Sequence, residues 1–215
     1  MNNPTVKNFF AENLKLLLAL LGAILVIAAI VLFFQAKHEA KEREAANALF
    51  EMRKMTDPLT QAKDYKSAAG ILETVVEKFP GTRASFEANL MIADCFVDAK
   101  LPEKAIPYYT KAASEAPDNF TKVLALYSKG IAEESAGKVS EAVQSLDAAM
   151  KTSGSQFLTP EILMAQARSY EAMKNFAKAA EVYKTVEEKF ANKSYYSSAA
   201  AAFLAKINAA TGTVK

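Results

Sequence analysis

Residues that could carry acid–base, nucleophilic or metal chemistry are few in this sequence, and they lie far apart. The single histidine, His38, sits in a charged stretch, where a solvent-exposed side chain is a better interpretation than a ligand. Gly130 and the Gly137-Lys138 pair superficially match a phosphate-binding loop, but their spacing is wrong, and valine follows where that loop needs serine or threonine. No Cys/His cluster has zinc spacing, and neither Gly-x-Ser-x-Gly nor Gly-x-Gly-x-x-Gly occurs. The sequence therefore predicts a protein that is not an enzyme and that holds no cofactor or metal ion.

Charge and cysteine content exclude further classes of protein. The 26 basic and 24 acidic side chains are interspersed, so no basic surface for nucleic acid is expected. Cys95 is the only cysteine, which rules out a disulfide within the chain and leaves packing to hold the fold. Several aromatic residues could be mistaken for a small-molecule site, but they fall on helix positions that are expected to pack inside the fold. These residues are Phe96, Tyr109, Tyr170, Phe176 and Tyr183.

One segment near the start of the chain is almost entirely apolar. From Leu16 to Phe34 there are 19 residues without a charge, and 14 of them are leucine, isoleucine, valine or phenylalanine. The uncharged run continues to Ala36 and is bracketed by Lys15 and Lys37. At about 1.5 Å per residue it covers about 30 Å, the thickness of the hydrocarbon core of a bilayer. The sequence therefore predicts a single transmembrane helix over residues 14–36.

A cleaved signal peptide is the alternative interpretation of this segment. The apolar part of a signal peptide usually has about 7–15 residues and ends at a small-x-small site. Here the run is longer, and it ends in Phe33-Phe34-Gln35-Ala36-Lys37 without such a site. We therefore expect an uncleaved signal anchor, with residues 1–13 as a short cytoplasmic segment and residues 37–215 as one soluble domain.

A repeat of 37 residues organises this domain. An alanine returns at that interval, as Ala68, Ala105, Ala142 and Ala179. Four residues after each alanine comes a bulky residue, namely Leu72, Tyr109, Leu146 and Tyr183, and seven residues after it comes a small or apolar one. Offsets of 0, 4 and 7 trace one face of a helix. Twelve residues before the alanine stand the small residues Ala93, Gly130 and Ala167, which would let a second, antiparallel helix approach closely.

This pattern resembles the tetratricopeptide repeat, which has a small residue at its eighth position, alanine at its twentieth and proline at its thirty-second. The stretch from Phe86 to Pro117 carries all three features. The resemblance implies an all-α protein, a tetratricopeptide-like α-solenoid of about four repeats that follows the transmembrane helix. The repeats are expected at 38–80, 84–117, 121–154 and 158–192, with a C-terminal capping helix over 194–210.

The first repeat departs from the pattern. It has Thr56 where the other repeats have alanine or glycine, and Asp57-Pro58 follows at once. Because proline lacks a backbone donor, the leading helix is expected to end near Met55.

The same resemblance implies where partners bind. In the tetratricopeptide family the concave face is formed by defined positions of the first helix of each repeat. Carried over to this sequence, those positions include Leu90, Asp94, Tyr127, Ile131, Glu134, Met164, Arg168 and Glu171. We expect an apolar groove with an acidic rim that accepts a helix or an extended segment of another protein. The alternative is that the apolar members simply pack against a neighbouring helix.

The residues before the apolar run carry a second resemblance. Val6 to Lys15, which reads Val-Lys-Asn-Phe-Phe-Ala-Glu-Asn-Leu-Lys, resembles the YfgM family, the ancillary subunit of the SecYEG translocon. This resemblance implies a non-catalytic scaffold in the bacterial inner membrane, with its repeats in the periplasm. The implied partners are Sec translocon subunits, a membrane-anchored periplasmic chaperone such as PpiD, and translocating client proteins. A cell-envelope assembly adaptor with another partner is the alternative, because the regular repeats also resemble other envelope proteins such as the Tol-Pal coordinator.

The distribution of basic residues favours a third possibility. The residues that flank the apolar run are Lys7 and Lys15 before it, and Lys37, Lys41, Arg43, Arg53 and Lys54 after it. The positive-inside rule, applied to this count, places the repeats in the cytoplasm, as in a receptor that faces the cytoplasm. Glutamates are interleaved with the later basic residues, and the resemblance to YfgM favours the periplasm.

Overall fold

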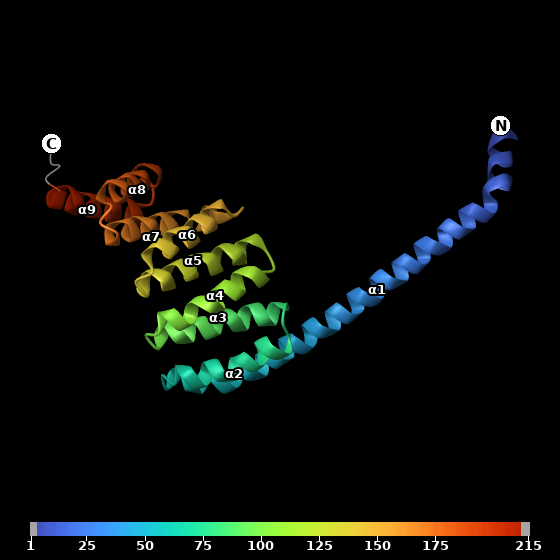
Figure 1. Ribbon diagram of the computed structural model, residues 1–215, viewed down its shortest axis with the longest axis horizontal. Helices are drawn as coiled ribbons and strands as arrows, with labels where there is room; N and C mark the ends of the chain where they lie inside the picture. The colour runs from blue at the N-terminus through green and yellow to red at the C-terminus, as the bar shows by residue number, and fades with distance from the viewer. Residues whose placement is uncertain (1–3, 212–215) are drawn as a thin grey trace. The chain divides into compact units, whose positions relative to one another are not determined.

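The computed structural model describes the backbone of residues 4–211 and the side chains of residues 13–16, 18–193 and 195–209. Within that range the regular elements are helices, and no strand occurs, which confirms the predicted all-α fold (Figure 1). The chain divides into two compact units, Met1–Glu44 and Ala45–Lys215, which are described separately below. The helices are α1 (Pro4–Gln61), α2 (Tyr65–Lys78), α3 (Arg83–Asp98), α4 (Pro102–Glu115), α5 (Asn119–Ser135), α6 (Val139–Lys151), the 3-10 turn η1 (Ser155–Phe157), α7 (Thr159–Ala172), α8 (Phe176–Lys189) and α9 (Ser194–Thr211).

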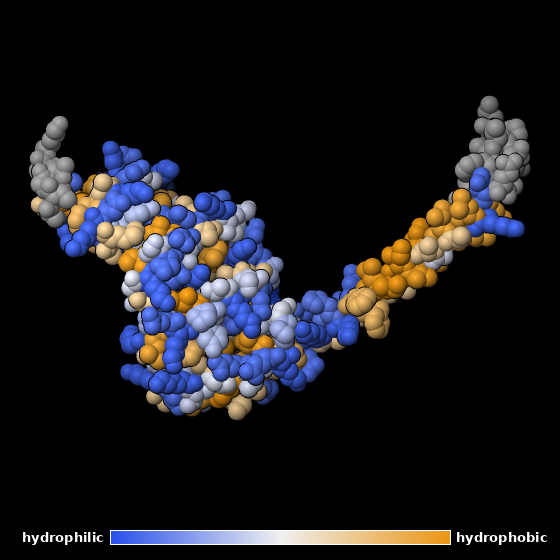
Figure 2. Space-filling view, viewed as in Figure 1, coloured by the Kyte–Doolittle hydropathy of each residue, from blue (hydrophilic) through white to orange (hydrophobic). Residues whose placement is uncertain are grey.

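The first unit consists of the leading part of α1. Its most apolar window has a mean hydropathy of 3.2, and none of that window is buried. The large apolar side chains described between Leu14 and Phe34 are 48% to 65% exposed, and Figure 2 shows them as an apolar surface along the helix. Among the helices described, α1 alone is long and apolar enough to cross a membrane, by length and composition.

In the second unit, the last turns of α1 form the first helix of the repeat array. The expectation that this helix ends near Met55 is wrong, because α1 continues through Pro58 to Gln61. Thr56 is 1% exposed and its hydroxyl donates to the carbonyl of Arg53 at 3.1 Å, while Leu59 packs against the core. Proline removes one backbone hydrogen bond, but the packing on both sides of it outweighs that loss.

Each first helix ends in the same way. Its last turn is followed by a residue in the left-handed region, namely Lys63 (φ 62°), Lys100 (φ 61°), Gly137 (φ 77°) and Lys174 (φ 59°). The N–H of the following residue then donates back to the carbonyl five residues earlier, at 2.8 Å in all four repeats. This is the Schellman arrangement, which satisfies a carbonyl at the helix end and turns the chain towards the second helix.

The recurring small residues lie where paired helices touch. Ala68, Ala105, Ala142 and Ala179 are 0% exposed. Gly130 is packed so closely that a Cβ atom there would lie 2.8 Å from Cγ of Leu146. The hairpins α3/α4, α5/α6 and α7/α8 therefore stack through contacts that the 37-residue pattern specifies, and the predicted α-solenoid is confirmed (Figure 1).

The C-terminal helix α9 covers the last hairpin. It buries Ala200 and Ile207 in a cluster with Tyr183, and the ring of Phe203 stacks on Tyr183 with centroids 5.2 Å apart. An array of repeats needs such a helix, because its final apolar face would otherwise be exposed to water.

Candidate partner-binding surface

The first helices of successive repeats enclose two adjoining hollows. The smaller, of about 160 Å³, lies between α3, α4 and α5 and is bordered by Val97, Tyr109 and Ile131. The larger, of about 390 Å³, lies between α5, α7 and α9. Tyr127 of α5 borders both hollows, so they form one continuous surface, which we call the inner face.

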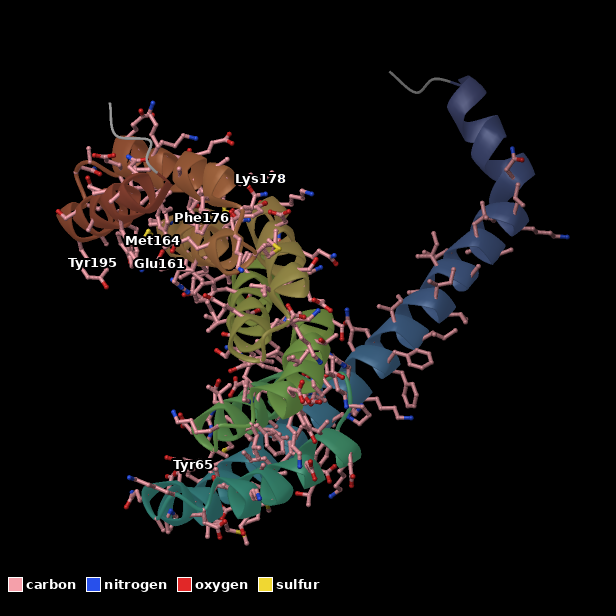
Figure 3. All side chains as sticks on the ribbon, turned by 60° about the vertical axis from the view of Figure 1, so that its left-hand side comes forward. Tyr65, Glu161, Met164, Phe176, Lys178 and Tyr195 are labelled. Atoms are coloured by element: carbon pink, nitrogen blue, oxygen red, sulfur yellow. The ribbon has the colours of Figure 1, made fainter. Side chains whose placement is uncertain are left out.

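The larger hollow has aromatic walls and polar residues beside them. Tyr127, Met164 and Arg168 border it on one side, together with Glu161 of α7. Tyr195, Tyr196, Ala199 and Phe203 of α9 border it on the other side. Figure 3 shows Glu161, Met164 and Tyr195 near one another at the end of the array that α7 and α9 share. The volume of the larger hollow lies at the low end of the range for ligand sites, about 300–1,000 Å³.

The apolar residues that were expected to bind partners divide into two groups. Tyr127 and Ile131 are half-buried and border the hollows, so part of each side chain faces outward. Met164 is 9% exposed and Leu90 packs in the clusters around Phe86 and Ala93, so both mainly hold helices together. The packing interpretation therefore describes Met164 and Leu90, whereas Tyr127 and Ile131 are placed where a partner could reach them.

Arg168 and Glu134 form a bidentate pair between α7 and α5. Nε and Nη2 of Arg168 donate to Oε1 and Oε2 of Glu134, each at 3.0 Å. Burial alone would lower the pKa of Arg168, but the carboxylate of Glu134 outweighs it and raises the pKa. Because the guanidinium already holds a carboxylate, it serves as a clamp between repeats and as a wall of the larger hollow.

Asp94 is also engaged within its own repeat. Its carboxylate accepts a hydrogen bond from the hydroxyl of Tyr109. Partial burial raises the pKa of Asp94, the hydrogen bond from Tyr109 opposes that rise, and the charge of Asp98 adds to it. Burial raises the pKa of Tyr109, so its hydroxyl stays protonated and remains a donor.

Glu171 does not border either hollow. It is half-buried beside Tyr183, whose pKa is raised first by burial and then by the carboxylate of Glu171. Glu161, which the tetratricopeptide pattern also assigns to the concave face, is the acidic residue that borders the larger hollow. Glu161 accepts a hydrogen bond from the hydroxyl of Tyr196, and its second oxygen is buried without a hydrogen-bond partner in the part of the chain described.

The residues of α9 are the main addition to the predicted site. The sequence did not predict that these residues belong to the site, because residues 194–210 were expected to cap the array and not to extend it. The 37-residue spacing does reach this helix, because position 204 follows Ala167 by that interval, but leucine there breaks the pattern of small residues and hid the relation. The helix α9 therefore stands where the first helix of a further repeat would stand, and its aromatic residues complete the inner face.

The arrangement is suited to binding protein side chains. Among the residues described, no group of three or more histidine, cysteine, aspartate or glutamate side chains is placed to hold a metal ion. The hollows instead offer aromatic rings, methyl groups and a few hydrogen-bonding groups, the composition of surfaces that receive anchor residues from a partner.

Comparison with known families agrees with this geometry. The family described as "Tetratricopeptide repeat-like domain" matches residues 7–159, and the family described as "Tetratricopeptide repeat" matches residues 161–193. Since the first match covers most of the chain, this chain belongs to the tetratricopeptide repeat-like domain family. Proteins of this kind are typically non-catalytic, and the repeats indicate a scaffold for protein–protein interactions.

Solved structures resemble the fold. A putative kinesin light chain from Podosopora anserina with nearly identical TPR-like repeats is similar at 16% identity, with a TM-score of 0.61 over 77% of this chain and 87% of that one. A second crystal structure of that protein, a variant with one substitution, is similar at 17% identity, with the same TM-score and coverage. At this identity the likeness shows the fold alone. No curated protein matches the sequence significantly.

Proposed function

We propose that this chain is a non-catalytic scaffold that α1 anchors in the bacterial inner membrane and that works beside the Sec translocon. Its repeat domain, in the periplasm, binds segments of chaperones or of translocating proteins and assists their translocation or folding. The N-terminal motif of residues 6–15 supports the translocon as partner, and the inner face supports the binding of protein segments.

The exposure of the apolar part of α1 carries the membrane proposal. Leaving a large aliphatic or aromatic side chain in water costs about 1.5–3 kcal/mol relative to burying it. The described large apolar side chains between Leu14 and Phe34 have no protein cover in the first unit, since none of the most apolar window is buried. A lipid bilayer removes this cost, and the length of the run matches its thickness.

The inner face favours a partner segment with two apolar anchors. Tyr127 separates two hollows of different size, so one anchor side chain fits on each side of its ring. Such anchors fit a helix or an extended segment, in which side chains recur at fixed spacing along one face. The larger hollow, with rings from Tyr196 and Phe203, is suited to the larger anchor.

A topology reporter tests the proposed side of the membrane. A reporter that is active only outside the cytoplasm, fused after Lys215, is expected to be active in cells. An inactive reporter, combined with retention of the protein in the membrane fraction, would favour the cytoplasm-facing receptor that the lysine and arginine count supports.

Crosslinking tests the proposed partner. Leu18 is 58% exposed in the first unit, so a photoreactive residue at this position would face whatever surrounds α1. We expect crosslinks to a translocon subunit or to a membrane-anchored chaperone. Crosslinks to an envelope-assembly protein instead would contradict the translocon and support the adaptor alternative.

A further inference from the structure

The third repeat contains a polar pocket that is separate from the inner face. The pocket has a volume of about 210 Å³ and lies between α5 and α6, bordered by Leu126, Lys129 and Glu133 of α5 and by Glu141 and Ser145 of α6. None of these residues borders either hollow of the inner face.

The neighbouring repeats fill the equivalent place with aromatic side chains. In the second repeat, the rings of Phe96 and Tyr108 stack with centroids 5.6 Å apart, and Nζ of Lys104 lies 5.9 Å from the ring of Phe96. In the fourth repeat, Nζ of Lys178 lies 5.3 Å from the ring of Tyr170. An aromatic ring on the first helix and a lysine above it from the second helix are thus shared by both neighbours.

The third repeat replaces every part of this arrangement. Counting 37 residues from Phe96, Lys104 and Tyr108 gives Glu133, Glu141 and Ser145. The ring becomes a carboxylate, the covering lysine becomes a second carboxylate, and the stacked tyrosine becomes a serine. The pocket exists because these side chains are smaller, and it is acidic because two of them are glutamates.

Glu133 is buried in a way that leaves part of its carboxylate unsatisfied. The residue is 4% exposed, and within the described structure its Oε2 atom has no hydrogen-bond partner. Nζ of Lys129 lies 3.6 Å from the other oxygen, Oε1, so that ion pair does not satisfy Oε2. A buried carboxylate oxygen without a donor is unfavourable, and a charged donor that reached it would recover that free energy.

We propose that this pocket binds a basic side chain, arginine or lysine, from a partner protein. The charges of Glu133, Glu141 and Lys129 leave the pocket with one net negative charge, which a cationic group would balance. The volume is below the range of about 300–1,000 Å³ for small-molecule sites, but it suits a single side chain. The incoming cation takes the position that a lysine of the chain itself occupies in the second and fourth repeats.

Peptides that differ in one side chain test this pocket directly. The full chain, carried in lipid nanodiscs with methyl-labelled leucine and alanine, is titrated with acetyl-Gly-Gly-Arg-Gly-Gly-amide and with its lysine and citrulline counterparts. We expect the methyl signals of Leu126 and Ala148, which both border the pocket, to shift with arginine or lysine but not with the neutral citrulline. Equal shifts with citrulline, no shift with either cation, or shifts confined to Ala199 of the inner face would overturn the proposal.

Substitutions separate the pocket from its surroundings. Glu133→Gln keeps the shape and removes the charge, so the dissociation constant of the cationic peptide should rise about tenfold or more. Glu181→Gln is the matched control, because Glu181 is exposed on α8 and follows Gln144 by 37 residues; it should leave binding unchanged. Equal effects of the two substitutions would contradict a specific site.

A transplant of the neighbouring repeat supplies an independent test. The triple variant Glu133→Phe, Glu141→Lys and Ser145→Tyr installs the residues of the second repeat, so the pocket should be filled. The variant is expected to lose the peptide-induced shifts at Leu126 and Ala148 and to unfold at a higher temperature. Binding that persists in a variant whose circular dichroism shows the native helix content would overturn the proposal.

Discussion

At the scale of single residues, the array is held by a few positions where only one side-chain size or backbone conformation fits. In the second, third and fourth repeats, the small residue of the first helix sets how near the second helix can come. In all four repeats, the left-handed residue at the end of the first helix sets the direction of the turn. Both are local requirements, and each can be tested by changing one residue.

Any side chain at Gly130 should destabilise the third repeat. A Cβ atom there would lie 2.8 Å from Cγ of Leu146, so Gly130→Ala should lower the free energy of unfolding by about 1–2 kcal/mol despite the better helix propensity of alanine. Gly70→Ala is the control, because nothing lies within 4 Å of a Cβ atom at Gly70 in α2, and it should stabilise by about 0.5–1 kcal/mol. Urea denaturation followed by circular dichroism measures both changes. A stabilised Gly130→Ala variant would show that the helices can move apart without cost.

At the lysines whose backbone lies in the left-handed region, substitution by glycine should stabilise the fold. Lys100 has a φ of 61°, a conformation that glycine adopts without the steric cost of a Cβ atom, and Gly137 already holds the same place in the third repeat. Lys100→Gly should therefore stabilise the domain by about 0.5–1 kcal/mol, after the larger backbone entropy of unfolded glycine is deducted. The reverse substitution, Gly137→Lys, should destabilise by a similar amount in the same urea experiment. Changes of the same sign in the two variants would contradict this account.

At the scale of the elements, helix ends decide where each hairpin begins. The helix α5 starts with a capping box, in which the carboxylate of Asp118 accepts from the backbone N–H of Thr121 at 2.8 Å. The backbone and hydroxyl of Thr121 lower the pKa of Asp118 below its usual value, since both donate to the charged form.

This shift predicts how stability depends on pH. Because the pKa of Asp118 is lower in the folded than in the unfolded chain, its contribution is complete above the unfolded pKa, about 3.9, and is lost as pH falls through the folded value. Asp118→Asn keeps the cap and removes the charge. At pH 7 the variant should have a lower melting temperature than the parent protein. This difference in melting temperature should shrink as pH falls below about 4. A difference that stays constant over that range would show that the charge contributes nothing.

At the scale of the whole repeat domain, the inner face joins residues from three repeats and from α9. Tyr127 and Ile131 border this face and also pack, partly buried, against the buried cluster around Leu146, so their roles in binding and in packing can be separated. The double substitution Tyr127→Ser and Ile131→Ser should lower the yield of the partner that is recovered by crosslinking. It should leave the helix content, measured by circular dichroism, unchanged. A loss of helix content in that variant would instead identify both residues as core. Phe120→Ser is a suitable control, because Phe120 is 55% exposed and stacks on Phe157, away from both hollows.

The contribution of the sequence differs between the fold and the candidate site. The all-α class and the stacked hairpins follow from the recurrence of Ala68, Ala105 and their successors, since helical periodicity is a property of neighbouring residues. The end of α1 could not be predicted, because tolerance of Pro58 depends on how tightly Thr56 and Leu59 pack against other helices.

For the candidate site, the sequence by itself pointed to positions on the first helices but could not decide which of them border the hollows. That decision depends on contacts between residues more than 30 positions apart, such as the pair of Arg168 with Glu134 and the hydrogen bond of Tyr196 to Glu161. It also depends on the packing of α9 beside α7, which converts an apparent cap into one wall of the larger hollow. A repeat pattern specifies local geometry through short-range spacing, whereas volumes and polar pairings arise only when separate helices are brought together.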